Sequence, residues 1–171
     1  MSDSPTREVY VTLAAPPRVE FYHIAIPRVY VELQFVAADP TRYERETIPV
    51  SLSTTRVAVT IGTVATAPRL YVYGACVDPV VIVSNAAGDE THRLTLTGSL
   101  SSDDALVIDS ARQWIDRYVA GVLQTGTDSG HGWLTSGQFP LLDPLDGATL
   151  YVALSSASGT PTGLLLMTRG Y

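Results

Sequence analysis

The chain has 171 residues, of which 46% are hydrophobic and 16% are charged. This length fits one domain of ordinary size, and the composition excludes disorder caused by high charge and low hydrophobicity. Cys76 is the only cysteine, which excludes an internal disulfide framework and a cysteine-based zinc cluster. The net charge is -6 and no lysine accompanies the 11 arginines, so we expect no nucleic-acid partner, because such a partner needs a basic face.

The sequence also lacks signals for targeting or membrane insertion. Met1–Pro5 is polar and acidic, without the basic and apolar regions of a secretory signal. No apolar run approaches the roughly 20 residues that a spanning helix needs. We therefore expect that the chain does not insert into a membrane. We also expect that it is made in a reducing cytoplasm, which fits a chain with a single cysteine.

Apolar residues alternate with polar ones along much of the chain, beginning with Val9–Leu13, Val29–Val36 and Val57–Ile61. A period of two residues predicts strands with one buried face. Further short apolar runs predict strands at Leu70–Tyr73, Val80–Val83, Leu94–Thr97, Leu106–Ile108, Leu150–Leu154 and Leu164–Met167. Segments rich in Gly, Pro, Asp and Ser separate these runs, which is typical of an all-β, antiparallel β-sandwich or barrel.

Residues 110–124 carry a different period. The apolar residues from Ala111 to Val122 recur at a helical spacing, and Ser110 could cap such a helix. Taken alone, this segment predicts an amphipathic helix with Trp114 and Tyr118 on its buried side.

The sequence shows no constellation of catalytic residues. A nucleophile elbow, a phosphate-binding loop, a dinucleotide fingerprint and a zinc-protease motif are all absent. His23 is expected in a strand, and His92 lies close to Asp89 and Glu90 without enough converging ligands for a metal. We therefore expect no enzymatic activity, no catalytic residue, no metal and no cofactor.

Exposed aromatic residues are the most informative class for binding, since they stack on sugars and fill protein interfaces. Trp133 lies beside loop residues Asp128, His131 and Gln138, and these four residues form a candidate glycan-binding site. The alternative for each aromatic ring is to cover the core of the sandwich.

Three segments resemble the distal tail protein family of siphovirus-type bacteriophages. The first is Val31–Tyr43, with its Asp-Pro-x-x-Tyr element, the second is Pro68–Ile82, and the third is Leu94–Asp109. Gly132–Leu141 and Asp146–Leu150 extend the resemblance toward the C-terminus. Together the segments span residues 29–171, and their order and spacing carry the resemblance.

The resemblance implies a structural protein of the phage tail tip or baseplate, located in the virion and made in the host cytoplasm. In that family an N-terminal β domain forms a ring that joins the tail tube to the tip hub, and a galectin-like β-sandwich follows it. The implied partners are further copies of the chain in a ring, with a hexamer as one stoichiometry, the tail tube protein and the tail-tip hub protein.

The composition shift near residues 44–68 gives the predicted division of the chain. Residues 1–49 form a short β arm or small β subdomain, a remnant of the ring-forming domain, and residues 50–171 form the galectin-like or jelly-roll sandwich. The family pattern has a strand after Ile108-Asp109, and a sheet partner can override local helix propensity. We therefore favour a strand that begins near Gln113 over the helix.

Two hypotheses for the function follow. The first is assembly of the phage tail tip through contacts between subunits. The second is a carbohydrate-binding β-sandwich that recognises a host cell-wall polysaccharide through the site at Trp133.

Overall fold

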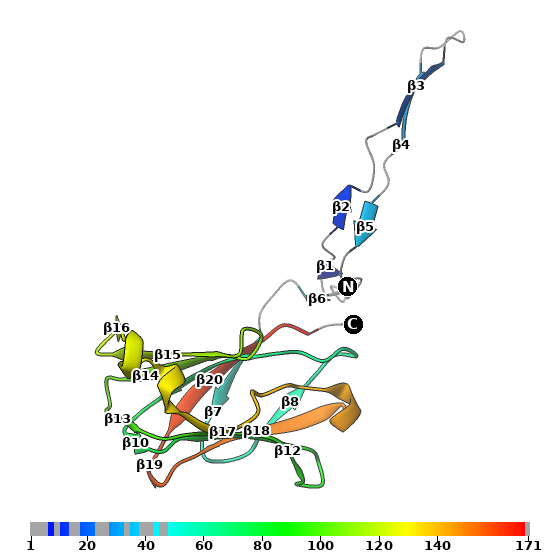
Figure 1. The fold of residues 1–171 in the computed structure, drawn as a ribbon. Coiled ribbons are helices and arrows are strands. Elements are labelled where there is room, and N and C mark those ends of the chain that lie inside the picture. The colour runs from blue at the N-terminus through cyan, green and yellow to red at the C-terminus, as the bar shows by residue number, and fades with distance from the viewer. Residues whose placement is uncertain are drawn as a thin grey trace.

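A computed structural model describes residues 48–169, without the side chain of Thr127, and the backbone alone of six short strands between residues 7 and 44. The predictions for His23 and for the buried side of Val29–Val36 lie outside the described residues. The chain is all-β and antiparallel, and its two main sheets form a β-sandwich (Figure 1), as the sequence predicted.

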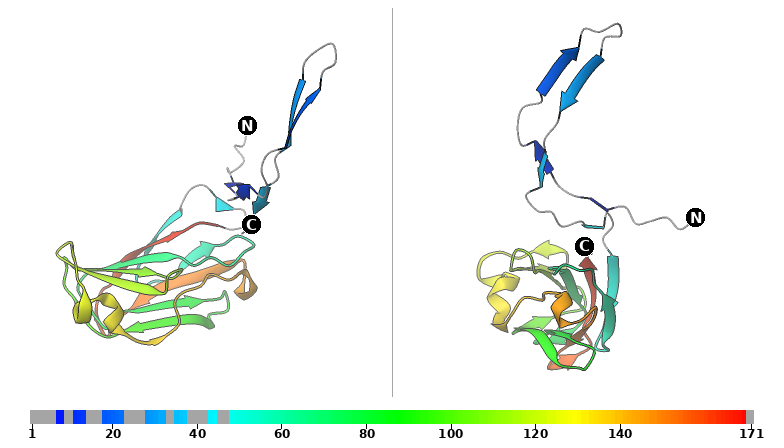
Figure 2. Two further views of the ribbon diagram at one scale, coloured as in Figure 1. Left: turned by 45° about the horizontal axis from the view of Figure 1, so that its top comes forward. Right: turned by 90° about the vertical axis from the view of Figure 1, so that its right-hand side faces the viewer.

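The six N-terminal strands pair in a nested order. They are β1 (Arg7–Glu8), β2 (Val11–Leu13), β3 (Arg18–Tyr22), β4 (Arg28–Glu32), β5 (Phe35–Ala37) and β6 (Tyr43–Glu44). β3 pairs with β4, β2 with β5, and β1 with β6, all antiparallel. This is the pairing order of one extended hairpin, which we call the N-terminal arm, and Figures 1 and 2 draw it outside the two sheets of the sandwich.

The larger of the two main sheets, which we call the front sheet, has six strands in the order β16-β15-β14-β9-β20-β7. Its strands are β7 (Ile48–Leu52), β9 (Arg69–Tyr73), β14 (Ala105–Asp109), β15 (Trp114–Val119), β16 (Val122–Leu123) and β20 (Thr162–Met167). β7 is the first strand of the sandwich along the chain. The division of the chain at residues 49 and 50 stays a prediction.

The back sheet has five strands in the order β17-β12-β11-β18-β8. Its strands are β8 (Val57–Thr60), β11 (Val80–Ser84), β12 (Glu90–Leu96), β17 (Leu134–Gly137) and β18 (Thr149–Ser155). A third, small sheet combines β10 (Cys76–Val77), β13 (Ser99–Leu100) and β19 (Ser158–Gly159). The described part of the chain also has three short 3-10 helices, which are η1 (Gly126–Asp128), η2 (Gly130–Trp133) and η3 (Pro144–Asp146).

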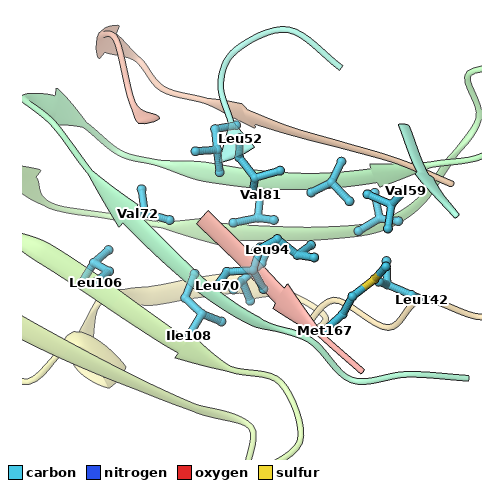
Figure 3. Close-up of a cluster of buried hydrophobic side chains, with 14 of the residues drawn as sticks. Leu52, Val59, Leu70, Val72, Val81, Leu94, Leu106, Ile108, Leu142 and Met167 are labelled. Carbon is cyan, nitrogen blue, oxygen red and sulfur yellow. The ribbon is translucent and has the colours of Figure 1, made fainter. Parts of the chain in front are cut away.

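The core lies between the front and back sheets, and its side chains come from alternate positions along each strand. In β9, for example, Leu70 and Val72 are fully buried, whereas Arg69 and Tyr71 face outward. Figure 3 shows Leu70, Leu106 and Ile108 of the front sheet in one cluster with Val81 and Leu94 of the back sheet. Each fully buried leucine or valine stabilises the fold by about 1.5–3 kcal/mol. The apolar side chains that alternate along the strands therefore hold the two sheets together.

Residues 110–124, which have a helical periodicity, form the strands β15 and β16 and no helix. This confirms the strand that we favoured from the family pattern. β15 begins at Trp114 and pairs with β14 along its length, with Ile115 opposite Ile108. Ile115 is fully buried while its neighbour Trp114 is 46% exposed, a difference that a strand produces and a helical stripe does not. The sheet partner β14 supplies backbone hydrogen bonds that outweigh the local helical pattern. No helix among the described residues is long and apolar enough to span a membrane.

Two leucines give a matched test of the core. Leu106 is fully buried in β14, and Leu145 in η3 is 92% exposed. We expect Leu106→Ala to lower the free energy of unfolding by about 2–5 kcal/mol through lost burial and an internal cavity. We expect Leu145→Ala to change it by less than about 0.5 kcal/mol. Urea denaturation followed by circular dichroism measures both, and similar losses in the two variants would contradict the assigned core.

Candidate functional site

The outer face of the front sheet carries a hollow of about 500 Å³. Polar and aromatic side chains from three neighbouring strands line it. They include Arg69 and Tyr71 of β9, Asp109 of β14, and Trp114, Asp116 and Tyr118 of β15.

The hollow is explained by the small size of the outward-facing side chains of β14, which lies between β9 and β15. Ala105 and Val107 of β14 face outward together with larger residues on both sides. Val107 lies opposite Tyr71 of β9 and Asp116 of β15 in the strand register, and Ala105 lies opposite Tyr118. The surface of the sheet is hollowed there because the small side chains of β14 lie between the larger side chains of β9 and β15.

An ion pair forms one end of the hollow. Arg69 Nη2 donates to Asp109 Oδ2 at 2.6 Å, and the backbone N–H of Arg112 donates to Asp109 Oδ1 at 3.1 Å. Asp109 lies directly opposite Arg69 in the register of β14 and β9, which explains the close approach.

These contacts change the acidity of Asp109. Burial, the largest single influence, acts to raise the pKa of its carboxyl. The hydrogen bonds from Arg69 and from the backbone of Arg112, together with the two positive charges, outweigh burial, and the pKa is lowered. The hydrogen bond with Asp109 is also the main cause that raises the pKa of Arg69. The carboxylate form of Asp109 is therefore the one that the folded chain favours.

Trp114 forms the aromatic side of the hollow, and two contacts hold its indole in place. The imidazole of His131 stacks on it with ring centroids 4.6 Å apart and an interplanar angle of 9°. The indole Nε1–H donates to Asp116 Oδ1 at 2.9 Å. With these contacts made, Trp114 is still 46% exposed, so a large aromatic surface is both oriented and open to solvent.

The helix η2 positions His131 by covering the free edge of β15. Gly130 approaches β15 so closely that a Cβ there would lie 2.7 Å from Cγ2 of Ile115. His131 then stacks on the outward-facing Trp114, whereas Trp133 packs against the core cluster. The Arg117 guanidinium lies over the Trp133 ring, 4.7 Å from its centroid. His131 and Trp133 thus contact different sides of the same strand.

The four residues predicted as a glycan site lie in four different surroundings. Asp128 is exposed in η1, His131 supports Trp114, and Trp133 is half-buried against Gly98 and Arg117. Gln138 follows β17 and lines a separate hollow beside Ser110. Whether any of them binds a glycan stays a prediction, and the structure puts only His131 in contact with a residue of the front-sheet hollow.

Trp114, Tyr71 and Tyr118 were not predicted from the sequence as a group. Their common signal is the alternation within β9 and β15, because outward positions of neighbouring strands share one face. That signal was obscured for Trp114 and Tyr118 by the helical period of their segment. Among the described residues, no three His, Cys, Asp or Glu side chains gather closely enough to hold a metal ion.

The sequence matches no protein-family model, and it matches no curated protein. The structure is similar to the crystal structure of the Dit protein (gp 19.1) of phage SPP1, with a TM-score of 0.67 and 13% sequence identity. That protein is described as a paradigm of the hub adsorption apparatus in phages that infect Gram-positive bacteria. The similarity covers 99% of this chain but 62% of the Dit chain, so this chain spans less than two thirds of that protein. The fold is therefore like that of a phage distal tail protein.

Asp109 gives a stability test with a defined pH dependence. Because its pKa is lowered in the folded chain, Asp109 stabilises the fold above the unfolded aspartate pKa of about 3.9, and this contribution is lost as pH falls through the folded pKa. We expect Asp109→Asn to lower the free energy of unfolding near neutral pH by on the order of 1 kcal/mol, since solvent screens the half-exposed Arg69. The difference from the unmodified chain should shrink below about pH 4.

Urea denaturation at several pH values measures this difference. Glu90→Gln is the control, because Glu90 pairs with Arg93 at 2.7 Å but both side chains are nearly half exposed. An exposed pair contributes little to stability, so Glu90→Gln should leave the midpoint unchanged. A loss in Asp109→Asn that is equally large at low and neutral pH would contradict the assigned role of the carboxylate.

Proposed function

We propose that this protein is a structural component of a bacteriophage tail that works through assembly. The observation that carries the proposal is the fold, which is shared with the Dit protein of phage SPP1 over 99% of this chain. A low sequence identity does not oppose it, because packed β-sandwich cores accept many hydrophobic sequences that keep volume and pattern.

Within the tail, we assign the protein to the tip or baseplate as a distal tail protein in the virion. There it would join the tail tube protein to the tail-tip hub protein. The resemblance of Val31–Tyr43, Pro68–Ile82 and Leu94–Asp109 to the distal tail family supports this position, since it rests on the sequence and is independent of the fold. On the same basis we assign the sandwich to the galectin-like type.

We further propose that the protein forms a ring of identical subunits, with a hexamer as the stoichiometry to test. The nested pairing of β1 to β6 supports this proposal, because an extended hairpin presents unpaired backbone groups along its edges. Such edges can pair with a neighbouring subunit. In this role the protein needs no catalytic residue, metal or cofactor, and we propose that it is not an enzyme.

Immunogold electron microscopy tests the position in the virion. An antibody raised against the purified chain is applied to phage particles whose genome encodes it. We expect gold particles at the end of the tail that is distal to the head, because that is where a tail-tip component is assembled. An unrelated antibody of the same class is the control, and label on the capsid, or only on debris, would contradict the proposal.

Light scattering coupled to size-exclusion chromatography tests the assembly. We expect the full chain to elute as a closed oligomer at high concentration, because cyclic rings of identical subunits satisfy every interface. A monomer at all concentrations, including in the presence of the purified tail tube protein, would remove ring formation from the proposal.

A further inference from the structure

We propose that the hollow on the outer face of the front sheet binds a neutral saccharide, with Trp114 as its stacking platform. This binding activity goes beyond the proposed role in tail assembly. It also places glycan recognition away from Asp128, Trp133 and Gln138, three of the four residues that the sequence indicated, and keeps the fourth, His131, as the support of Trp114.

The first argument is the state of Trp114. A large apolar ring left 46% exposed would normally pack against the fold or turn freely in solvent. Here the stack on His131 and the hydrogen bond to Asp116 keep the ring in one orientation without burying it. Because a ring that is already oriented loses little conformational entropy on binding, this arrangement favours a ligand that stacks on it.

The second argument is the combination of rings and polar groups in the hollow. Tyr71 and Tyr118 are both partly exposed and line the hollow together with Trp114. Sugar rings have apolar C–H faces and hydroxyl edges, so their binding sites combine aromatic faces with groups that hydrogen-bond to hydroxyls. Asp116 uses Oδ1 for the indole, and a carboxylate has further acceptor capacity on its second oxygen.

The third argument is charge. The hollow is lined by the carboxylates of Asp103, Asp109 and Asp116 and by the guanidiniums of Arg69 and Arg112, so three negative charges face two positive ones. Asp109 is paired with Arg69 at 2.6 Å. A polyanion such as a phosphate-rich or sulfated polymer needs an excess of positive charge. The hydroxyl groups of a neutral saccharide both donate and accept hydrogen bonds. Such a ligand therefore fits a hollow whose negative and positive charges are nearly balanced.

The size of the hollow fits the same class of ligand. Its volume of about 500 Å³ lies in the range of small-molecule sites, about 300–1,000 Å³. Its floor is formed by Ala105 and Val107 of β14, a strand that is paired on both sides. The shape is therefore present before a ligand arrives.

A glycan array followed by fluorescence titration tests the proposal on the full purified chain. The array carries neutral oligosaccharides of hexoses and N-acetylhexosamines together with sulfated, uronic and phosphate-containing ones. We expect binding to at least one neutral oligosaccharide with a Kd stronger than about 1 mM. No neutral binder on the array, or binding to anionic glycans alone, would overturn the proposal.

The two tryptophans of the chain make the readout specific. Trp114 and Trp133 are the only tryptophans, so Trp133→Phe leaves Trp114 as the sole indole. In this variant the glycan should still bind and should change the tryptophan emission. Trp114→Phe should bind and leave the emission of Trp133 unchanged. Trp114→Ala should lose affinity by about tenfold or more, with its thermal unfolding compared to confirm that it folds.

His131→Ala tests the support of the platform. His131 is a positioning residue, so its loss should weaken glycan binding less than the loss of Trp114. It should also shift the emission of Trp114 in the unliganded Trp133→Phe background, because the stacked imidazole is removed. Full affinity in Trp114→Ala, or equal losses in Trp114→Ala and Trp133→Phe, would overturn the proposal. These measurements use the isolated chain, so their failure leaves the tail position, tested by electron microscopy, unaffected.

Discussion

The sandwich depends on one constraint, which is that the apolar faces of two antiparallel sheets must cover each other. Leu70, Leu106 and Ile108 of the front sheet have no exposed surface, and neither do Leu94 and Leu150 of the back sheet. With a single buried cysteine and no disulfide, the chain relies on this burial. A chain of about 170 residues can bury enough surface for a core without covalent links.

The same alternation that fills the core also decides what lies on the outer face. When Leu106 and Ile108 of β14 point inward, Ala105 and Val107 must point outward, where they leave room between the larger side chains of β9 and β15. The hollow is thus a by-product of strand geometry and of a choice of small residues on one strand. Function can be carried by such a surface without any change in the core, which is how one fold supports several functions.

The edge of β15 shows how the fold protects an exposed strand while placing a functional residue. β16 pairs with only the end of β15, at Tyr118 and Val119. The remaining edge is covered by the loop that contains η2, and Gly130 permits the close contact. An uncovered edge invites pairing with other chains. The position of η2 also brings His131 onto Trp114. The same short helix therefore covers the edge of the sheet and orients the Trp114 ring.

By itself the sequence determined the all-β class and most of the strands, because a period of two residues is a local property that needs no knowledge of partners. Its periodicity alone did not predict strands at residues 110–124, where the apolar residues from Ala111 to Val122 recur at a helical spacing. Pairing with β14 settled that segment, since inter-strand hydrogen bonds are made with residues that are near in space. The candidate site depended on the tertiary structure even more. Proximity in the sequence grouped Trp133 with Gln138, whereas the sheet places Trp114 and Tyr71, which are 43 positions apart along the chain, around one hollow. Which side chains share a face is set by register between strands, and register is fixed only when the two sheets close on a common core.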